Sequence, residues 1–272
     1  MQELPVEVYE LEPFFNVPDC NPPRWMLMLR AYLDETFEDK DKCAWVCGHL
    51  GSKESWTEFV PKWNAALGKN RTRLHMVSLR WGKPSTERLL ARLGPIPALC
   101  GMQPVVSGVK FPDYADLVSG TEVEKISAGY LLSIIRVTTA VLFSIPDNER
   151  VEFVFENRGD ENPKNVKLEH TVMRAMNLTI AIAGADPRLC TRDGKHKMAN
   201  WSFVPKDDCM LFDQADYLCY ATLQHYRDEQ SKKAKWCAPI LQKNEEAIGG
   251  GLASRDEIRD TIAKAFPDRV RM

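Results

Sequence analysis

Residues 25–35 read WMLMLRAYLDE, the clearest strand signal in the chain. From Trp25 to Leu33 the chain is apolar and almost uncharged, which is typical of a strand buried on both faces of a sheet. Asp34 and Glu35 follow directly, so we expect the strand to end there. The chain therefore contains a central strand with two carboxylates at its carboxyl end.

Strand and helix candidates alternate along the rest of the chain. Further strands are expected at Cys43–Leu50, Leu74–Leu79, Pro104–Val109, Val151–Phe155 and Leu178–Ala183. Residues Gly184–Asn200 are polar and rich in Gly, Asp and Lys, which predicts a loop. Helices are expected at Trp56–Leu67, Pro84–Leu93, Thr121–Ile145, Pro163–Met176, Cys209–Arg227 and Ser254–Phe266. This alternation predicts an α/β fold, a mixed central sheet with helices on both faces.

Composition limits the class of protein. The 272 residues carry 36 basic and 38 acidic side chains and a net charge of −2, which excludes a strongly basic nucleic-acid scaffold and a strongly acidic tail. We expect three regions: an extended N-terminal arm at 1–23, an α/β domain at 24–230 and a C-terminal helical appendage at 231–272.

Cellular location is inferred from the N-terminus and the cysteines. MQELPVEVYELEPFF has neither a basic start nor an apolar segment, so it does not resemble a secretory signal. We therefore expect a cytoplasmic protein whose eight cysteines are reduced thiols. The apolar stretch Ile126–Ile145 holds Arg136 near its middle, which favours a buried helix over a membrane span.

Three acidic features stand out by their positions. Asp34 and Glu35 follow the central strand, and Glu156 follows Val151–Phe155, with Asp160 just beyond. Asp216 lies at the margin of the apolar face of helix Cys209–Arg227, whereas Asp213 points away from that face. Acids from two strands and one helix can form an oxygen-ligand site for Mg²⁺ or Mn²⁺. Carboxylates are also common at strand ends and helix caps without any metal, and spacing alone does not separate the two interpretations.

Five segments together resemble the domain-of-unknown-function 3800 family. YLDET at Tyr32–Thr36 is similar to the "YxDESG" opening of that family, and FDQADYLCY at Phe212–Tyr220 to its "LQxADLLAY" helix. CGHLGSKESWTEFVPKWNAALG, LHM at Leu74–Met76 and VEFVFENRGDENP are similar to its second strand and helix, its His-Met strand and its late strand. The resemblance spans Tyr32 to about Tyr220. It implies a ribonuclease H-like fold, in which acids on the first strand, a later strand and a late helix bind a divalent metal.

The resemblance transfers roles to individual residues. Asp34 matches the first-strand acid, Glu35 its neighbour and Asp216 the helix acid, while Glu156 stands where many members have Asp. Two further departures are Thr36-Phe37 in place of Ser-Gly and Asp213-Gln214 in place of Leu-Gln. A helix also lies between the second and third expected strands, so the sheet need not follow ribonuclease H order.

The sequence thus predicts a metal-dependent phosphodiester hydrolase that acts on nucleic acid. Asp34, Glu156 and Asp216 would hold Mg²⁺ or Mn²⁺, and Glu35 would be a further ligand or base. His75 would either hold a metal ligand in place or act as a general base. The alternative is a non-catalytic binding or regulatory module that retains the fold.

Two other groups of residues are candidates for a functional site. Cys43, Cys47 and His49 share a strand face, but a zinc site needs a fourth ligand, so buried thiols are expected there. Lys232, Lys233, Lys235 and Trp236 form a small basic-aromatic group, which is either a phosphate contact or a solvated helix end.

Overall fold

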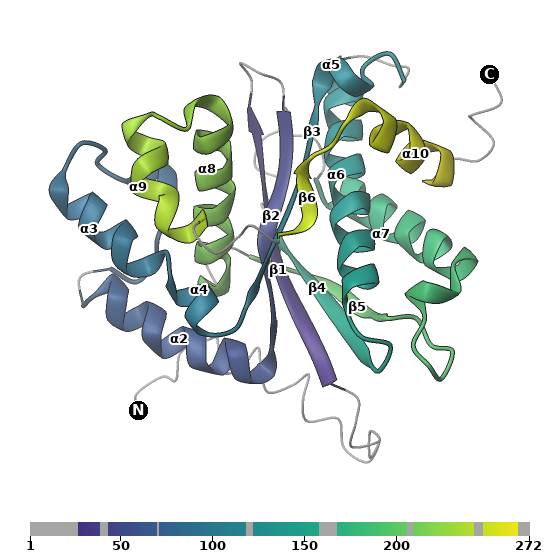
Figure 1. The fold of residues 1–272 in the computed structure, drawn as a ribbon, viewed down its shortest axis with the longest axis horizontal. Coiled ribbons are helices and arrows are strands. Elements are labelled where there is room, and N and C mark those ends of the chain that lie inside the picture. The colour runs from purple at the N-terminus through teal and green to yellow at the C-terminus, as the bar shows by residue number, and fades with distance from the viewer. Residues whose placement is uncertain are drawn as a thin grey trace.

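A six-stranded mixed sheet organises the chain (Figure 1). The computed structural model describes residues 27–38, 43–69, 71–117, 122–157, 168–205, 209–241 and 247–265. The strand order is β5-β4-β1-β2-β3-β6. The strands are β1 (Leu27–Glu38), β2 (Cys43–Ser52), β3 (Gln103–Lys110), β4 (Glu149–Asn157), β5 (Met198–Pro205) and β6 (Ile248–Leu252). The predicted α/β class, with a mixed sheet, is confirmed.

Strand β1 is central and has neighbours of both directions. It is antiparallel to β2 and parallel to β4, while β2 is antiparallel to β3. The outer strands β5 and β6 are parallel to β4 and β3, respectively. The predicted end of the strand at Asp34 is wrong, because the ladder with β2 continues to the pair Glu38 and Cys43. Pairing with β2 thus extends β1 beyond Asp34 and Glu35.

Helices cover both faces of this sheet (Figure 1). The two faces are called here the α8 face and the α6 face. The α8 face carries α2 (Lys53–Leu67), α3 (Pro84–Leu93), α4 (Ile96–Leu99), α8 (Asp213–Asp228) and α9 (Lys232–Leu241). The α6 face carries α5 (Phe111–Tyr114), α6 (Glu122–Ser144), α7 (Leu168–Ala185) and α10 (Arg255–Ala265). Three short 3-10 turns complete the described elements: η1 (Met76–Ser78), η2 (Pro187–Leu189) and η4 (Met210–Phe212).

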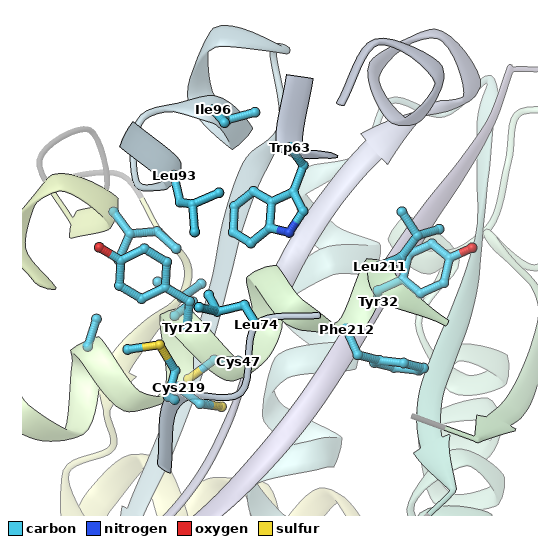
Figure 2. Close-up of a cluster of buried hydrophobic side chains, with 14 of the residues drawn as sticks. Tyr32, Cys47, Trp63, Leu74, Leu93, Ile96, Leu211, Phe212, Tyr217 and Cys219 are labelled. Atoms are coloured by element: carbon cyan, nitrogen blue, oxygen red, sulfur yellow. The ribbon is translucent and has the colours of Figure 1, made fainter. Parts of the chain in front are cut away.

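The strands divide their side chains between two large cores. Alternate residues of β1 point to opposite faces, so Tyr32 joins the core beneath α8, whereas Ala31 and Leu33 join the core beneath α6. Figure 2 shows the α8-face core, in which Trp63 of α2 lies among side chains from distant parts of the chain.

Local signals place several helix ends. Helix α2 begins three residues before the expected start at Trp56, because the side chain of Ser52 accepts a hydrogen bond from the Ser55 N–H. It ends at Gly68, whose φ of 80° is available to glycine at little cost. Helix α3 starts at Pro84, as predicted, since proline needs no N–H partner at that position.

Helix α6 is the apolar helix expected from the sequence. It is long and apolar enough to cross a membrane, and 61% of its window Ser127–Ser144 is buried. Ser133 donates to the Ala44 carbonyl of the sheet, and Thr138 is hydrogen bonded to Thr179 of α7 at 2.9 Å. The helix therefore packs between the sheet and α7 in this structure.

Three sequence predictions on secondary structure are wrong. Leu178–Ala183 belongs to α7 and not to a strand, because residues such as Ala175, Thr179 and Ala183 form a helical stripe buried against α6. Leu74–Leu79 forms η1 and turns, and β5 occupies part of the expected loop and the residues after it. β5 forms a strand because it pairs with β4, although the residues before it are polar.

The last part of the chain is integrated into the fold. Of the expected appendage at 231–272, α9 packs on α8 and α3, and β6 extends the sheet beside β3. Helix α10, predicted at Ser254–Phe266, opens with a capping box, in which the Ser254 N–H donates to Glu257 at 2.7 Å and the Glu257 N–H donates to Ser254. The expected arm at 1–23, Pro163 and Asp160 lie outside the described residues.

Candidate functional site

Two buried carboxylates lie side by side on the central strands. Leu33 of β1 is in register with Phe155 of β4, and both belong to the α6-face core. The next residue of each strand, Asp34 and Glu156, therefore points to the α8 face. Their exposed fractions are only 1% and 5%. The two acids, each one residue past the last paired position of the β1–β4 ladder, are called here the carboxylate pair.

The same two strands carry an ion pair four residues earlier. Arg30 is in register with Glu152, and its Nε donates to Glu152 Oε2 at 2.8 Å. Both residues are buried, so opposite charges compensate each other at that level of the sheet. Asp34 and Glu156 follow the last residues that pair β1 with β4 and point to the same face, and carboxylates that share a site repel each other. A cation or a proton lowers the free energy of such a pair.

Helix α8 packs directly on Asp34. The Cys219 thiol donates to the Asp34 carbonyl oxygen at 3.3 Å, and the Asp34 side chain accepts the Glu35 N–H at 2.8 Å. Cys47, the register partner of Asp34 on β2, lies beside Cys219, as Figure 2 shows. Burial raises the pKa of the Cys219 thiol, so it remains neutral. No disulfide joins the seven cysteines that the structure describes.

Asp216 also lies on α8, where it binds a neighbouring loop through hydrogen bonds. It precedes Cys219 by three residues and so lies on the same flank of α8. Its Oδ2 accepts the Met76 N–H at 3.0 Å and lies 3.1 Å from His75 Nδ1. One turn earlier, Asp213 accepts the Leu74 N–H at 2.6 Å. The two acids therefore hold residues 74–76 along the helix.

Asp213 is more buried than its position on the helix predicts. Its exposed fraction is 0%, because residues 73–76 cover the outer side of α8. Burial raises its pKa to about 6, opposed by Arg73, whose Nε donates to Asp213 Oδ1 at 2.7 Å. The sequence places Asp213 away from the centre of the apolar face of this helix, and its burial comes from residues 73–76 on the outer side.

His75 is held at the rim of the site. Its imidazole is half exposed, and Asp216 binds it through Nδ1. A carboxylate at Nδ1 orients the ring and leaves Nε2 as the nitrogen for another partner. This is the geometry of a histidine that can exchange a proton with a bound molecule.

His49 is a polar group that the sequence prediction left aside. It is buried on β2, and its Nδ1 lies against Oε1 of Gln214 on α8. The Gln214 amide donates to the Leu211 carbonyl, so its oxygen is the acceptor and His49 Nδ1 is the donor. Burial lowers the pKa of His49 to about 4. The shared strand face of His49 and Cys47 was visible in the sequence, but the glutamine partner was not.

The structure separates the remaining predicted residue from this group. Glu35 points to the α6 face, because it follows Asp34 on a continuous strand and is in register with Val46 of that core. Asp34 and Glu156 are thus neighbours, Asp216 and His75 lie at the flank of α8, and Glu35 is on the other side of the sheet.

The carboxylate pair provides part of the coordination shell of a hard divalent cation. Mg²⁺ commonly uses one or two protein carboxylates and completes its shell with water and substrate phosphate. Asp34 and Glu156 provide two such ligands. Among the described residues, however, no three His, Cys, Asp or Glu side chains are grouped so as to hold a metal ion. Asp216 is engaged with residues 75 and 76 and does not complete such a group here.

The thiols of Cys47 and Cys219 do not extend this site into a zinc centre. They lie beside the acids, but a structural zinc site needs four ligands, and the described residues contain no such group. No family model, curated protein or solved structure matches the chain. Its function is therefore inferred from its own geometry.

Proposed function

We propose that the chain is a divalent-cation-dependent phosphodiester hydrolase on a ribonuclease H-like core, acting on nucleic acid. The observation that carries this proposal is the carboxylate pair, Asp34 and Glu156, buried side by side on parallel strands beneath α8. Two acids at one level of a sheet suit a cation, whereas Arg30 and Glu152 neutralise each other at the level below.

The topology supports the same proposal. Strands β1 to β5 follow the order 5-4-1-2-3, with β2 antiparallel to its neighbours and β4 and β5 parallel to β1. The first strand and a later strand, which carry the acids in the ribonuclease H-like fold that the resemblance implies, are thus adjacent, and β6 is an addition at one edge. Helices α2, α3 and α4, which lie between β2 and β3 in the chain, cover the α8 face and leave the order unchanged (Figure 1).

The side chains have distinct tasks in this proposal. Asp34 and Glu156 would hold Mg²⁺ or Mn²⁺, which when bound supplies a more acidic water and neutralises the charge of a phosphate oxygen. Asp216 holds residues 75 and 76 and orients the His75 ring. His75 then takes or gives a proton through Nε2 at the edge of the site. Glu35 takes no part, because it points to the α6 face.

The first test measures metal binding apart from catalysis. Mn²⁺ that binds the native state raises the thermal midpoint, by about 2.7 kcal/mol of stability at one hundred times its Kd. Asp34→Asn and Glu156→Gln should each abolish the shift. Glu35→Gln is the matched control, since it removes one carboxylate from the next position of the same strand, and it should retain the shift. A wild-type protein with no shift at millimolar Mn²⁺ would refute the metal site.

The second test measures cleavage of labelled DNA and RNA, single-stranded and duplex, with Mg²⁺ or Mn²⁺. Asp34→Asn should lose cleavage, whereas Glu35→Gln should keep it. Unchanged cleavage in Asp34→Asn and Glu156→Gln would show that the activity comes from elsewhere.

A non-catalytic binding module is the second candidate. It is favoured by one observation, the engagement of Asp216 with residues 75 and 76, which takes the third acid out of the metal group. This candidate predicts an Mn²⁺-induced shift, or none, without cleavage of any of the four substrates. Metal-dependent cleavage that is lost in Asp34→Asn would eliminate it.

A further inference from the structure

The loop before α3 is strongly basic. Residues 69–83 contain Lys69, Arg71, Arg73, Arg80 and Lys83, and no acid occurs between Glu58 and Glu87. Because the whole chain has a net charge of −2, this is a local concentration of positive charge. Arg71, Arg80 and Lys83 are exposed. Within the described part of the chain, none of these three forms an ion pair.

The first turn of α9 adds to the same surface through an aromatic cluster. Trp81 of the loop stacks on Tyr220 of α8 at 5.0 Å and on Trp236 of α9 at 6.1 Å. Lys233 Nζ lies 5.5 Å from the centre of the Trp81 ring, and Lys232 Nζ lies 4.9 Å from that of Trp236. These contacts join two basic segments that are far apart in the sequence. The loop–α9 surface is defined here as Arg71, Arg80, Trp81, Lys83, Lys232 and Lys233.

This surface continues into the candidate site. Residues 74–76 belong to the same loop, and Asp213 and Asp216 fasten them to α8 through the N–H groups of Leu74 and Met76. His75, at the rim of the site, is thus part of the basic loop. Val77, the next residue but one, is an apolar side chain with an exposed fraction of 70%. The loop therefore presents an exposed apolar side chain together with its cations.

We infer that the loop–α9 surface binds the backbone of a single-stranded nucleic acid. Exposed lysines and arginines attract phosphates and release their counterions. A duplex hides its base faces, whereas an open strand presents them to exposed apolar side chains such as Val77. Delivery of the strand to the carboxylate pair rests on the proposed function, but binding itself does not and is measured without metal.

The test is fluorescence anisotropy of labelled oligothymidine and oligouridine with the full chain in EDTA. Arg80→Glu with Lys83→Glu, and separately Lys232→Glu with Lys233→Glu, should each weaken binding about tenfold or more. The slope of log K against log salt should fall by about 0.7 for each phosphate contact removed. The matched control is Arg259→Glu with Lys264→Glu, the same charge change on exposed residues of α10, across the sheet (Figure 1). It should remain within about threefold of the wild type.

Three further ligands test the chemistry of the surface. An abasic oligonucleotide of equal length should bind several-fold more weakly, because it has phosphates without bases. A duplex of the same length and polyglutamate should both be poorer ligands than the single strand. Equal binding of the abasic strand or the duplex would overturn the single-strand assignment, and equal binding of polyglutamate would overturn the assignment to nucleic acid.

Failure of this inference is distinguishable from failure of the proposed function. No binding of any oligonucleotide in EDTA, or an equal loss in the α10 control, would overturn the loop–α9 surface and leave the Mn²⁺ shift of the carboxylate pair unaffected. Loss of binding in both surface variants, with thermal midpoints close to that of the wild type, would support the inference. Circular dichroism gives those midpoints.

Discussion

The buried histidine of β2 should make stability depend on pH in a defined direction. His49 has a pKa of about 4 in the folded chain, against 6.5 as its ordinary value, because burial disfavours the imidazolium. A depressed folded pKa means that the unfolded chain takes up the proton first as pH falls. The stabilising contribution is therefore complete above pH 6.5 and is lost as pH falls toward 4. One pKa unit corresponds to about 1.4 kcal/mol, so the loss amounts to about 3 kcal/mol.

Urea unfolding of the wild type and of His49→Asn, measured between pH 4 and pH 7.5, tests this value. The variant lacks the titrating ring, so the difference in unfolding free energy between the two proteins should shrink by about 3 kcal/mol on acidification. Gln214→Ala is the companion variant. It leaves the buried His49 N–H without its acceptor and should cost about 1–3 kcal/mol at neutral pH. Parallel pH profiles for the wild type and His49→Asn would refute the assignment of a neutral buried imidazole.

Three other predictions concern the same framework. Arg30→Met should cost about 3–5 kcal/mol because it leaves Glu152 buried without its cation, whereas Arg30→Met combined with Glu152→Leu should recover most of that loss in urea unfolding. Burial raises the pKa of Asp213 to about 6, so the protonated side chain contributes stability that is complete below pH 3.8 and is lost as pH rises through 6. Asp213→Asn should remove about 3 kcal/mol of that pH dependence of the unfolding free energy, and an unchanged pH profile would contradict this prediction. Gly48→Ala should destabilise the protein by about 3 kcal/mol or more, since its Cβ would lie 1.8 Å from a carbonyl oxygen of β1, whereas Gly184→Ala, with 3.8 Å to its nearest neighbour, should be neutral or stabilising.

Much of the local structure followed from short-range signals. Helix α3 begins at Pro84, the capping box of Ser254 and Glu257 opens α10, and Gly68 closes α2. These features depend on backbone groups within one helical turn, so neighbouring residues suffice to specify them. The apolar stretch around Leu33 also formed the central strand as predicted.

Other elements depended on partners that lie far away in the sequence. Leu74 and Met76 alternate as in a strand, yet their N–H groups are bound by Asp213 and Asp216, and the described chain provides no strand beside them. The segment Leu178–Ala183 is rich in β-branched residues, but packing against α6 makes it helical. In both segments tertiary contacts override the local preference for a strand, because they give the backbone another environment.

The candidate site could likewise be predicted only in part from the sequence. The acids Asp34, Glu156 and Asp216, and the apolar strands that carry the first two, can be read from the sequence. The fold was needed to show that Asp34 shares a face with Glu156 while Glu35 does not, and that Asp216 fastens a loop. The reason is that a side chain's face depends on where its strand begins and ends and on its register. Register is set by hydrogen bonds between strands separated by more than one hundred residues.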